Sequence, residues 1–350
     1  MSFAITGHCS QTSKKEVQTR NPNSMRSSVI LVFVTATCLF GSADKVRGDS
    51  FSPPAGHCLL IIGQDKDSTD EYTKAVGLPL GGTMMYTSIQ ELKGMTTATE
   101  YGAGVQDFSY LAERYPDAVL QIGLYMVGAL NDVAAGKYDS NIDRLGDWIR
   151  KTKRPVYLRV GYEFDYPENN YEPREYIRAF RHVRDRLEKH QVSNVAYVWH
   201  SYAGPNSGNS AQWYPGDDYV DWVAVSWFDP KQPHLETIAR LAKRLGKPLM
   251  IAEATARRIG TKQGSRTWNQ WFRPCLEYMK RHDVRVLCYI NWEWDSFQMF
   301  RGQGWGDCRI QANRIVQAEW LKEFSSTRYL QPSAQLFSTL GYKSRETSRN

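Results

Sequence analysis

Eight short apolar runs, separated by stretches with helical spacing, constrain the fold of this chain most strongly. The runs cover residues 57–65, 82–88, 118–126, 153–165, 194–201, 220–228, 249–255 and 284–292. The helical patterns lie at 105–113, 140–151, 173–187, 234–245, 266–282 and 311–324. Strands that alternate with helices are typical of parallel sheets, and eight of them without a long linker predict one (β/α)8 TIM barrel of the α/β class.

We assign residues 44–325 to this barrel and expect 326–350 to be a loosely held tail. The segment before the barrel has a different pattern: Met25-Arg26 precedes an apolar run at 29–40 and small residues at 41–43. This is the layout of a signal peptide. We therefore expect 1–43 to be an N-terminal extension and signal peptide (about 25–43), with translation starting at Met25, in a secreted or periplasmic protein. A membrane anchor formed by the same segment is the alternative.

The cysteines after residue 43 are Cys58, Cys275, Cys288 and Cys308. An oxidising compartment permits disulfides, but the spacing does not determine the pairing. Cys275 with Cys308 is the first pair to test, because Cys58 and Cys288 lie in apolar runs as small core residues do. The formal charge of +7 is mild, and no nucleic-acid-binding motif is present. We expect no cofactor, and no membrane insertion of the mature chain.

The run at 153–165 holds an arginine and ends in a carboxylate. Strand alternation puts Tyr157, Arg159, Gly161 and Glu163 on one face and Tyr162 on the other. Burying charged side chains within so apolar a run is costly unless they are ion-paired or serve a function. In a barrel of this type, the active site lies at the carboxyl ends of the strands.

Glu163 ends the fourth strand and Glu253 the seventh, beside aromatic residues. Two such carboxyl groups suggest a retaining glycosidase, with Glu163 as acid/base and Glu253 as nucleophile. Arg159 would keep Glu253 ionised. The residues expected to meet the sugar are Gln64 and His200 through hydrogen bonds, Trp292 as a stacking floor, and Trp227, Trp294 or Tyr202 at outer subsites.

Other readings of these residues remain open. Glu163 could be a structural partner of Arg159, Glu293 or Asp229 could replace Glu253, and His200 could be a core histidine. A metal site of Asp65, His200 and Asp229 has no supporting ligand spacing.

Three segments carry a resemblance to a known family. Arg159-Val-Gly-Tyr-Glu163 is similar to an Arg-Pro-x-His-Glu motif, Trp213–Asp221 to a Tyr-Pro-Gly-Asp-x-Tyr-Val-Asp motif, and Lys247–Glu253 to a Lys-Pro strand. They resemble glycoside hydrolase family 26, of β-mannanase and β-1,3-xylanase type, or a sister family in its clan of retaining barrels. The resemblance spans about Gly63 to Trp294. It implies that Glu163 is the acid/base and Glu253 the nucleophile.

The sequence departs from that family at two positions expected to contact the substrate. Tyr162 stands where the family has a sugar-binding histidine, and Phe228 where it has a tyrosine that orients the nucleophile. The expected function is a secreted, endo-acting retaining hydrolase of a mannan-like or xylan-like polysaccharide. The basic residues Arg257, Arg258, Lys262, Arg266 and Arg301 favour an anionic or sulfated polysaccharide as an alternative. A non-catalytic carbohydrate-binding barrel is a further one.

Overall fold

The computed structural model describes residues 51–100 and 102–343, and in this part eight parallel strands close into a barrel. The strands are β1 (Cys58–Gly63), β2 (Gly82–Ser88), β5 (Val119–Tyr125), β6 (Val156–Val160), β7 (Val195–Ser201), β8 (Trp222–Trp227), β9 (Leu249–Ala254) and β10 (Val286–Ile290). Pairing of β10 with β1 completes the ring. The predicted (β/α)8 barrel is confirmed. The expected extension and signal peptide, residues 1–43, lie outside the described residues.

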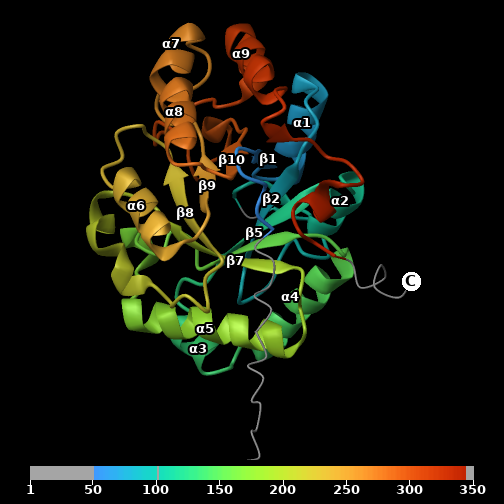
Figure 1. Ribbon diagram of the computed structural model, residues 1–350, viewed down its shortest axis with the longest axis vertical. Coiled ribbons are helices and arrows are strands. Elements are labelled where there is room, and N and C mark those ends of the chain that lie inside the picture. The colour runs from blue at the N-terminus through green and yellow to red at the C-terminus, as the bar shows by residue number, and fades with distance from the viewer. Residues whose placement is uncertain (1–50, 101, 344–350) are drawn as a thin grey trace, which may run out of the picture. The chain divides into compact units, whose positions relative to one another are not determined.

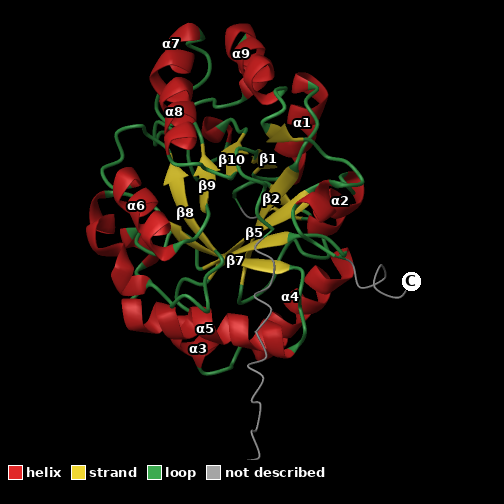
Figure 2. Cartoon of the chain, in the orientation of Figure 1, coloured by secondary structure: helices red, strands yellow, loops and turns green. Residues whose placement is uncertain are grey.

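Helices surround the barrel strands, as Figures 1 and 2 show. They are α1 (Lys66–Val76), α2 (Phe108–Arg114), α3 (Leu130–Ala134), α4 (Asp139–Thr152), α5 (Pro173–Lys189), α6 (Leu235–Leu245), α7 (Ser265–Thr267), α8 (Arg273–Arg281), α9 (Arg314–Phe324) and α10 (Leu336–Thr339). A π-helical turn at Trp268–Phe272 joins α7 to α8. Among the described helices, none is both long and apolar enough to cross a membrane.

Three of the described helices, α1, α3 and α10, were not predicted. The sequence of α1 is largely polar, and its buried face uses Ser68 and Thr69 beside Tyr72 and Val76. Its start is fixed instead by Asp65, whose side chain accepts a hydrogen bond from the Ser68 backbone in a capping box. The start of the helix predicted at 105–113 is also different, because residues 105–106 form β4 (Val105–Gln106), which pairs with β3 (Thr99–Glu100).

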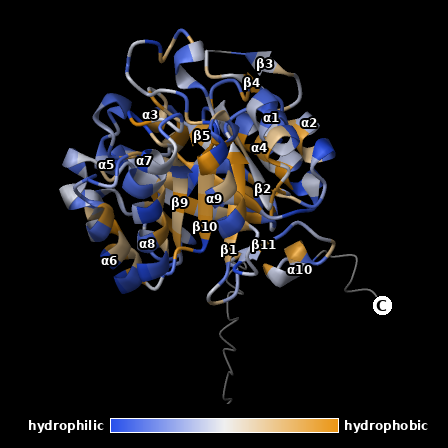
Figure 3. Cartoon of the chain, turned by 90° about the horizontal axis from the view of Figure 1, so that it is seen from above, coloured by the Kyte–Doolittle hydropathy of each residue, from blue (hydrophilic) through white to orange (hydrophobic). Residues whose placement is uncertain are grey.

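The segment after residue 326 is not a loosely held tail where the structure describes it. Strand β11 (Tyr329–Leu330) pairs with the first residues of β1, and Tyr329, Leu336 and Leu340 are buried. In Figure 3, β11 and α10 lie at the opposite end of the barrel from β3 and β4. The last described residues therefore cover the amino-terminal end of the barrel, and they leave the other end to the loops.

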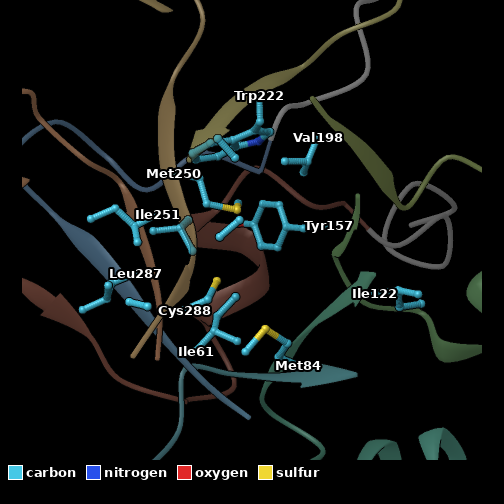
Figure 4. Close-up of a cluster of buried hydrophobic side chains, with 14 of the residues drawn as sticks. Ile61, Met84, Ile122, Tyr157, Val198, Trp222, Met250, Ile251, Leu287 and Cys288 are labelled. Carbon is cyan, nitrogen blue, oxygen red and sulfur yellow. The ribbon is translucent and has the colours of Figure 1, made fainter. Parts of the chain in front are cut away.

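Large side chains fill the barrel interior (Figure 4). Tyr157 on β6 packs edge-on against Trp222 of β8, with ring centroids 5.5 Å apart, and its hydroxyl donates to the Phe51 carbonyl at 2.5 Å. The cysteines of the described residues are all buried with free thiols, so the Cys275–Cys308 pair is not formed. The core is thus packed by apolar side chains rather than cross-linked.

Candidate active site

The chain turns abruptly where β6 ends. Gly161 has a φ of +56° and Glu163 a φ of +51°, the left-handed region in which residues other than glycine are uncommon. This turn breaks the strand alternation, so Tyr162 and Glu163 both line one cleft instead of pointing to opposite faces. Asn169 stabilises the turn, because its Nδ2 donates to the Tyr162 and Glu163 carbonyls at 3.2 and 2.9 Å.

A β-bulge in β9 sets the direction of Glu253. Val225 of β8 pairs with Ile251, yet the next residue, Ser226, pairs with Glu253, so β9 carries one extra residue at Ala252. Bulges re-aim side chains in this way. Without the extra residue, alternation would give the inward position to Ala252 and turn Glu253 out of the barrel.

A chain of hydrogen bonds joins the two carboxyl groups across four neighbouring strands. Nη1 of Arg159 on β6 contacts both Oε1 of Glu253 and, at 3.3 Å, Nδ1 of His200 on β7. Nε2 of His200 lies 3.0 Å from Oγ of Ser226 on β8, and this hydroxyl donates to Oε1 of Glu163 at 2.5 Å. The two glutamates therefore belong to one polar network.

The two glutamates have different electrostatic environments. Burial and the nearby Glu253 charge raise the pKa of Glu163 to about 8, although Ser226 and Arg159 act in the opposite direction. Glu253 instead forms an ion pair with the fully buried Arg159. Burial, together with the charge of Arg159, holds the pKa of His200 well below its usual value, so this imidazole is neutral. One carboxyl group is thus kept protonated near neutral pH and the other is paired as an anion.

Two tyrosine rings enclose the guanidinium of Arg159. Its Cζ lies 4.9 Å from the ring centroid of Tyr86 and 4.9 Å from that of Tyr162. Cation–π contacts of this kind compensate a buried cation for part of its lost hydration. The tyrosine that replaces the family's histidine therefore supports the arginine that binds Glu253.

The cleft above this network has a volume of about 630 Å³ and largely aromatic walls. Glu163, Glu253 and Gln64 line the cleft. Its aromatic lining residues are Tyr86, Tyr125, Tyr162, Tyr166, Tyr202, Phe228, Trp294, Phe300 and Trp305. Aromatic faces joined by a few polar groups are common in ligand sites. The cleft is open at the carboxyl ends of the strands, where the barrel fold predicts a site.

Several of the predicted contact residues do not reach this cleft. Trp292 is 3% exposed and stacks on Phe297 with ring centroids 3.8 Å apart. Trp227 packs against Tyr278. His200 and Arg159 lie beneath the glutamates and are fully buried. Of the outer-subsite candidates, Trp294 and Tyr202 line the cleft.

Sequence reasoning missed Ser226, Tyr86 and Trp305. Ser226 lies inside a predicted strand, and its position next to Trp227 gave no sign of a role. Tyr86 and Trp305 contact Arg159 and Arg257 respectively, from loops or strands far away in the chain. The one available signal was the high share of aromatic residues, which does not identify individual positions.

The alternative site residues have other contacts. Glu293 pairs with Arg309 at 2.9 Å and Asp65 caps α1, while Asp229 lies in a small neighbouring hollow. Within residues 51–100 and 102–343, no group of three or more acidic, histidine or cysteine residues could hold a metal ion. Of the predicted basic residues, Arg257 alone lines the described cleft, and Lys262 pairs with Asp307 at 3.2 Å.

A (β/α)8 barrel whose fourth and seventh strands bring two glutamates into an aromatic cleft fits the class of glycoside hydrolases. The chain matches the model of glycosyl hydrolase family 26 over residues 139–294. It is 34% identical over 313 residues to the β-1,3-xylanase TXYA of a Vibrio species, covering 81% of this chain and 68% of that protein. It is 32% identical over 345 residues to a β-1,3-xylanase of an Alcaligenes species, covering 90% and 73%.

A solved structure shares the fold: the family 26 β-mannanase of Bacteroides ovatus aligns with a TM-score of 0.61 at 15% identity, covering 81% of this chain and 93% of that one. The chain belongs to glycosyl hydrolase family 26. It is an endo-acting glycosidase of a β-linked polysaccharide.

Proposed function

We propose that this enzyme hydrolyses β-1,3-xylan with retention of configuration, with Glu163 as acid/base and Glu253 as nucleophile. The observation that carries the proposal is that two carboxyl groups in one cleft have different environments. Desolvation and the Glu253 charge raise the pKa of Glu163 to about 8, whereas Glu253 is ion-paired with Arg159. A neutral carboxylic acid beside a carboxylate is what a retaining glycosidase needs.

In the first step, the Glu253 carboxylate attacks the anomeric carbon while Glu163 gives its proton to the departing glycosidic oxygen. Arg159 holds the attacking carboxylate in place through Oε1. Once Glu253 becomes an ester, its negative charge is gone, and this charge was the second largest cause of the raised pKa of Glu163. Glu163 is then free to act as a base on the incoming water in the second step.

The relatives support the choice of substrate within the β-linked polysaccharides. The two β-1,3-xylanases share about a third of their residues with this chain over most of its length, whereas the mannanase shares its fold at 15% identity. We therefore place β-1,3-xylan before mannan.

The test incubates the purified enzyme separately with β-1,3-xylan, β-1,4-xylan and β-1,4-mannan, and analyses the products over time. We expect rapid release of mixed oligosaccharides from β-1,3-xylan, with the β-anomer appearing first by NMR. First appearance of the α-anomer, or activity confined to mannan, would overturn the proposal. Glu163→Gln and Glu253→Gln should each lower kcat by about 10³-fold or more.

A second candidate substrate is a β-xylan or related glycan that carries acidic groups. Arg257 lines the cleft, lies 4.0 Å from the Trp305 ring centroid and has a buried Nε without a hydrogen-bond partner among the described residues. A carboxylate or sulfate on the glycan would pair with the Arg257 guanidinium where it lines the cleft. Arg257→Gln should then slow cleavage of an acidic glycan more than that of a neutral one.

We also propose that the enzyme is secreted, with residues 25–43 acting as the signal peptide. The support is the order of basic, apolar and small residues in that segment. Expression from Met25 in a secreting host should give a mature protein in the medium whose first residue lies near Asp44, as read by N-terminal sequencing. Retention with the cell membrane would favour the anchor alternative.

A further inference from the structure

The direction of each hydrogen bond between Arg159 and Glu163 is fixed by chemistry. A guanidinium can only donate, so Nδ1 of His200, 3.3 Å from Nη1 of Arg159, must accept. The proton of the neutral imidazole therefore sits on Nε2, which donates to Oγ of Ser226 at 3.0 Å. The single hydroxyl proton of Ser226 then has one acceptor left, Oε1 of Glu163 at 2.5 Å.

We propose that Ser226 and His200 are positioning residues that keep Oε1 of Glu163 occupied as an acceptor and so hold the transferable proton on Oε2. This inference rests on the proposed role of Glu163 as the acid. Oε1 cannot carry the proton, because a donor already points at it. Ser226 is fully buried, so Oε1 faces the barrel interior and Oε2 is the oxygen left for the substrate.

The proposal gives a defined proton transfer. The Oε2–H bond breaks as the proton joins the glycosidic oxygen, which also takes the electron pair of its bond to the anomeric carbon. Glu253 forms the new bond to that carbon. Glu163 is left as a carboxylate whose Oε1 still accepts from Ser226, a charge-assisted bond that stabilises the anion.

Strand register places Arg159, His200, Ser226 and Glu253 in the network, and the turn after β6 adds Glu163. Arg159 pairs with Val198 two residues before His200, His200 pairs with Ala224 two residues before Ser226, and Ser226 pairs with Glu253. The contacts from Arg159 to His200 and from His200 to Ser226 therefore join neighbouring strands, whereas the contacts to Glu163 and Glu253 cross the barrel interior. A network on paired strands holds its geometry within the small tolerance that catalysis needs.

The test compares two substrates in the full-length enzyme and its Ser226→Ala variant. A β-1,3-xylooligosaccharide has a poor leaving group and needs the acid, whereas its 2,4-dinitrophenyl glycoside departs without protonation. The measured quantity is kcat/KM, which reports the first, acid-assisted step. Because general acids contribute about 10²–10⁴-fold, we expect kcat/KM of Ser226→Ala to fall about 10–100-fold on the oligosaccharide and less than about 3-fold on the aryl glycoside.

A matched control is Ser207→Ala, which removes another fully buried serine hydroxyl that has no hydrogen-bond partner among the described residues. It should leave both values unchanged. For His200, glutamine offers an acceptor and a donor and should restore the oligosaccharide rate, whereas phenylalanine should not. Equal losses of Ser226→Ala on both substrates, no loss at all, or equal rates for His200→Gln and His200→Phe would overturn the inference.

The Glu163→Ala variant separates this inference from the proposed function. If Glu163 is the acid, its removal must show the same split between the two substrates, only larger. If Glu163→Ala lowered kcat/KM equally on both substrates, the role of Glu163 itself would be rejected. If the loss of kcat/KM were larger on the oligosaccharide for Glu163→Ala but equal on both substrates for Ser226→Ala, only the positioning role would be rejected.

Discussion

Ser226 on β8 stands directly opposite Glu253 on β9, although plain alternation would place Ala252 there. One extra residue in β9 produces this match. It puts the proposed nucleophile into the barrel interior, where Arg159 binds it, and next to the serine that contacts Glu163. The relation between these two strands thus decides whether the carboxyl groups can work together.

Replacing Arg159 and replacing Glu253 should have strongly non-additive effects on the free energy of unfolding. Arg159→Met leaves a buried carboxylate without its partner, which costs about 3–5 kcal/mol in the free energy of unfolding. The double variant Arg159→Met/Glu253→Gln removes the unpaired charge and should recover most of that loss. Urea unfolding of the single and double variants measures the coupling; additive effects would show that the pair contributes little.

Glu163 should make the protein less stable as the pH rises. Its pKa is raised on folding, so the protonated side chain is favoured; the stabilisation is complete below the ordinary glutamate pKa and is lost as the pH passes about 8. Glu163→Gln cannot ionise. The Tm of this variant relative to the wild type should therefore be several degrees higher at pH 9 than at pH 5. A difference in Tm that stays constant with pH would contradict the raised pKa.

Gly161→Ala should impair both stability and activity. Its φ of +56° is strained for alanine, and a Cβ would lie 2.8 Å from Met126 Cε and 2.9 Å from Tyr176 Cε2. Gly246→Ala is a matched control, because Gly246 also has a positive φ, of +62°, but no atom within 4 Å of the added Cβ. Both should lose about 1–2 kcal/mol from strain. The additional loss, and a drop in kcat, should be confined to Gly161→Ala, as thermal unfolding and initial rates will show.

Two tryptophans should respond differently to replacement by alanine. Trp305 lines the cleft, so Trp305→Ala should raise KM by about 3–10-fold through a lost stacking surface. Trp292 is buried beneath Phe297, so Trp292→Ala should lower the free energy of unfolding by about 3–5 kcal/mol. The measurements are KM on β-1,3-xylan and urea unfolding. If Trp292→Ala raised KM more than Trp305→Ala did and left the free energy of unfolding unchanged, Trp292 would be the sugar-stacking residue after all.

The thiols within the described residues should be inert until the protein unfolds. Cys58, Cys275, Cys288 and Cys308 are all buried, and burial raises the pKa of each thiol. A thiol reagent such as dithionitrobenzoate should label none of them in the native enzyme and four in urea. Dithiothreitol should leave the Tm unchanged; a drop would indicate a disulfide.

The strands were the most predictable part of the fold. The run at 118–126, for example, became β5 (Val119–Tyr125), because a strand buried on both faces is a continuous apolar segment. Helix α1 could not be predicted, since threonine and serine take places on its buried face that apolar residues usually fill. The prediction of a loosely held tail was wrong, because β11 pairs with β1 through residues some 270 positions apart in the chain.

The site was predictable only in part. Because the sequence places Glu163 and Glu253 at the carboxyl ends of two parallel strands, it predicted that both lie at one end of the barrel, and both line the cleft there. The sequence did not predict the environment of Trp292 correctly. A loop residue, Phe297, covers its ring, so Trp292 does not form the expected stacking floor. Nothing in a local pattern indicates which aromatic side chain another segment will bury.

The sequence by itself determined the barrel and the end of it that carries two carboxyl groups, because apolar periodicity and strand order are local properties of the chain. Tertiary structure decided which way those groups point. The bulge at Ala252 turns Glu253 inward, and the left-handed turn at Gly161 brings Tyr162 and Glu163 to the same cleft. The pairing of β7 with β8, and of β8 with β9, aligns His200 and Ser226 between the two glutamates. These features depend on how strands fit against their neighbours, and that fit exists only in the folded barrel.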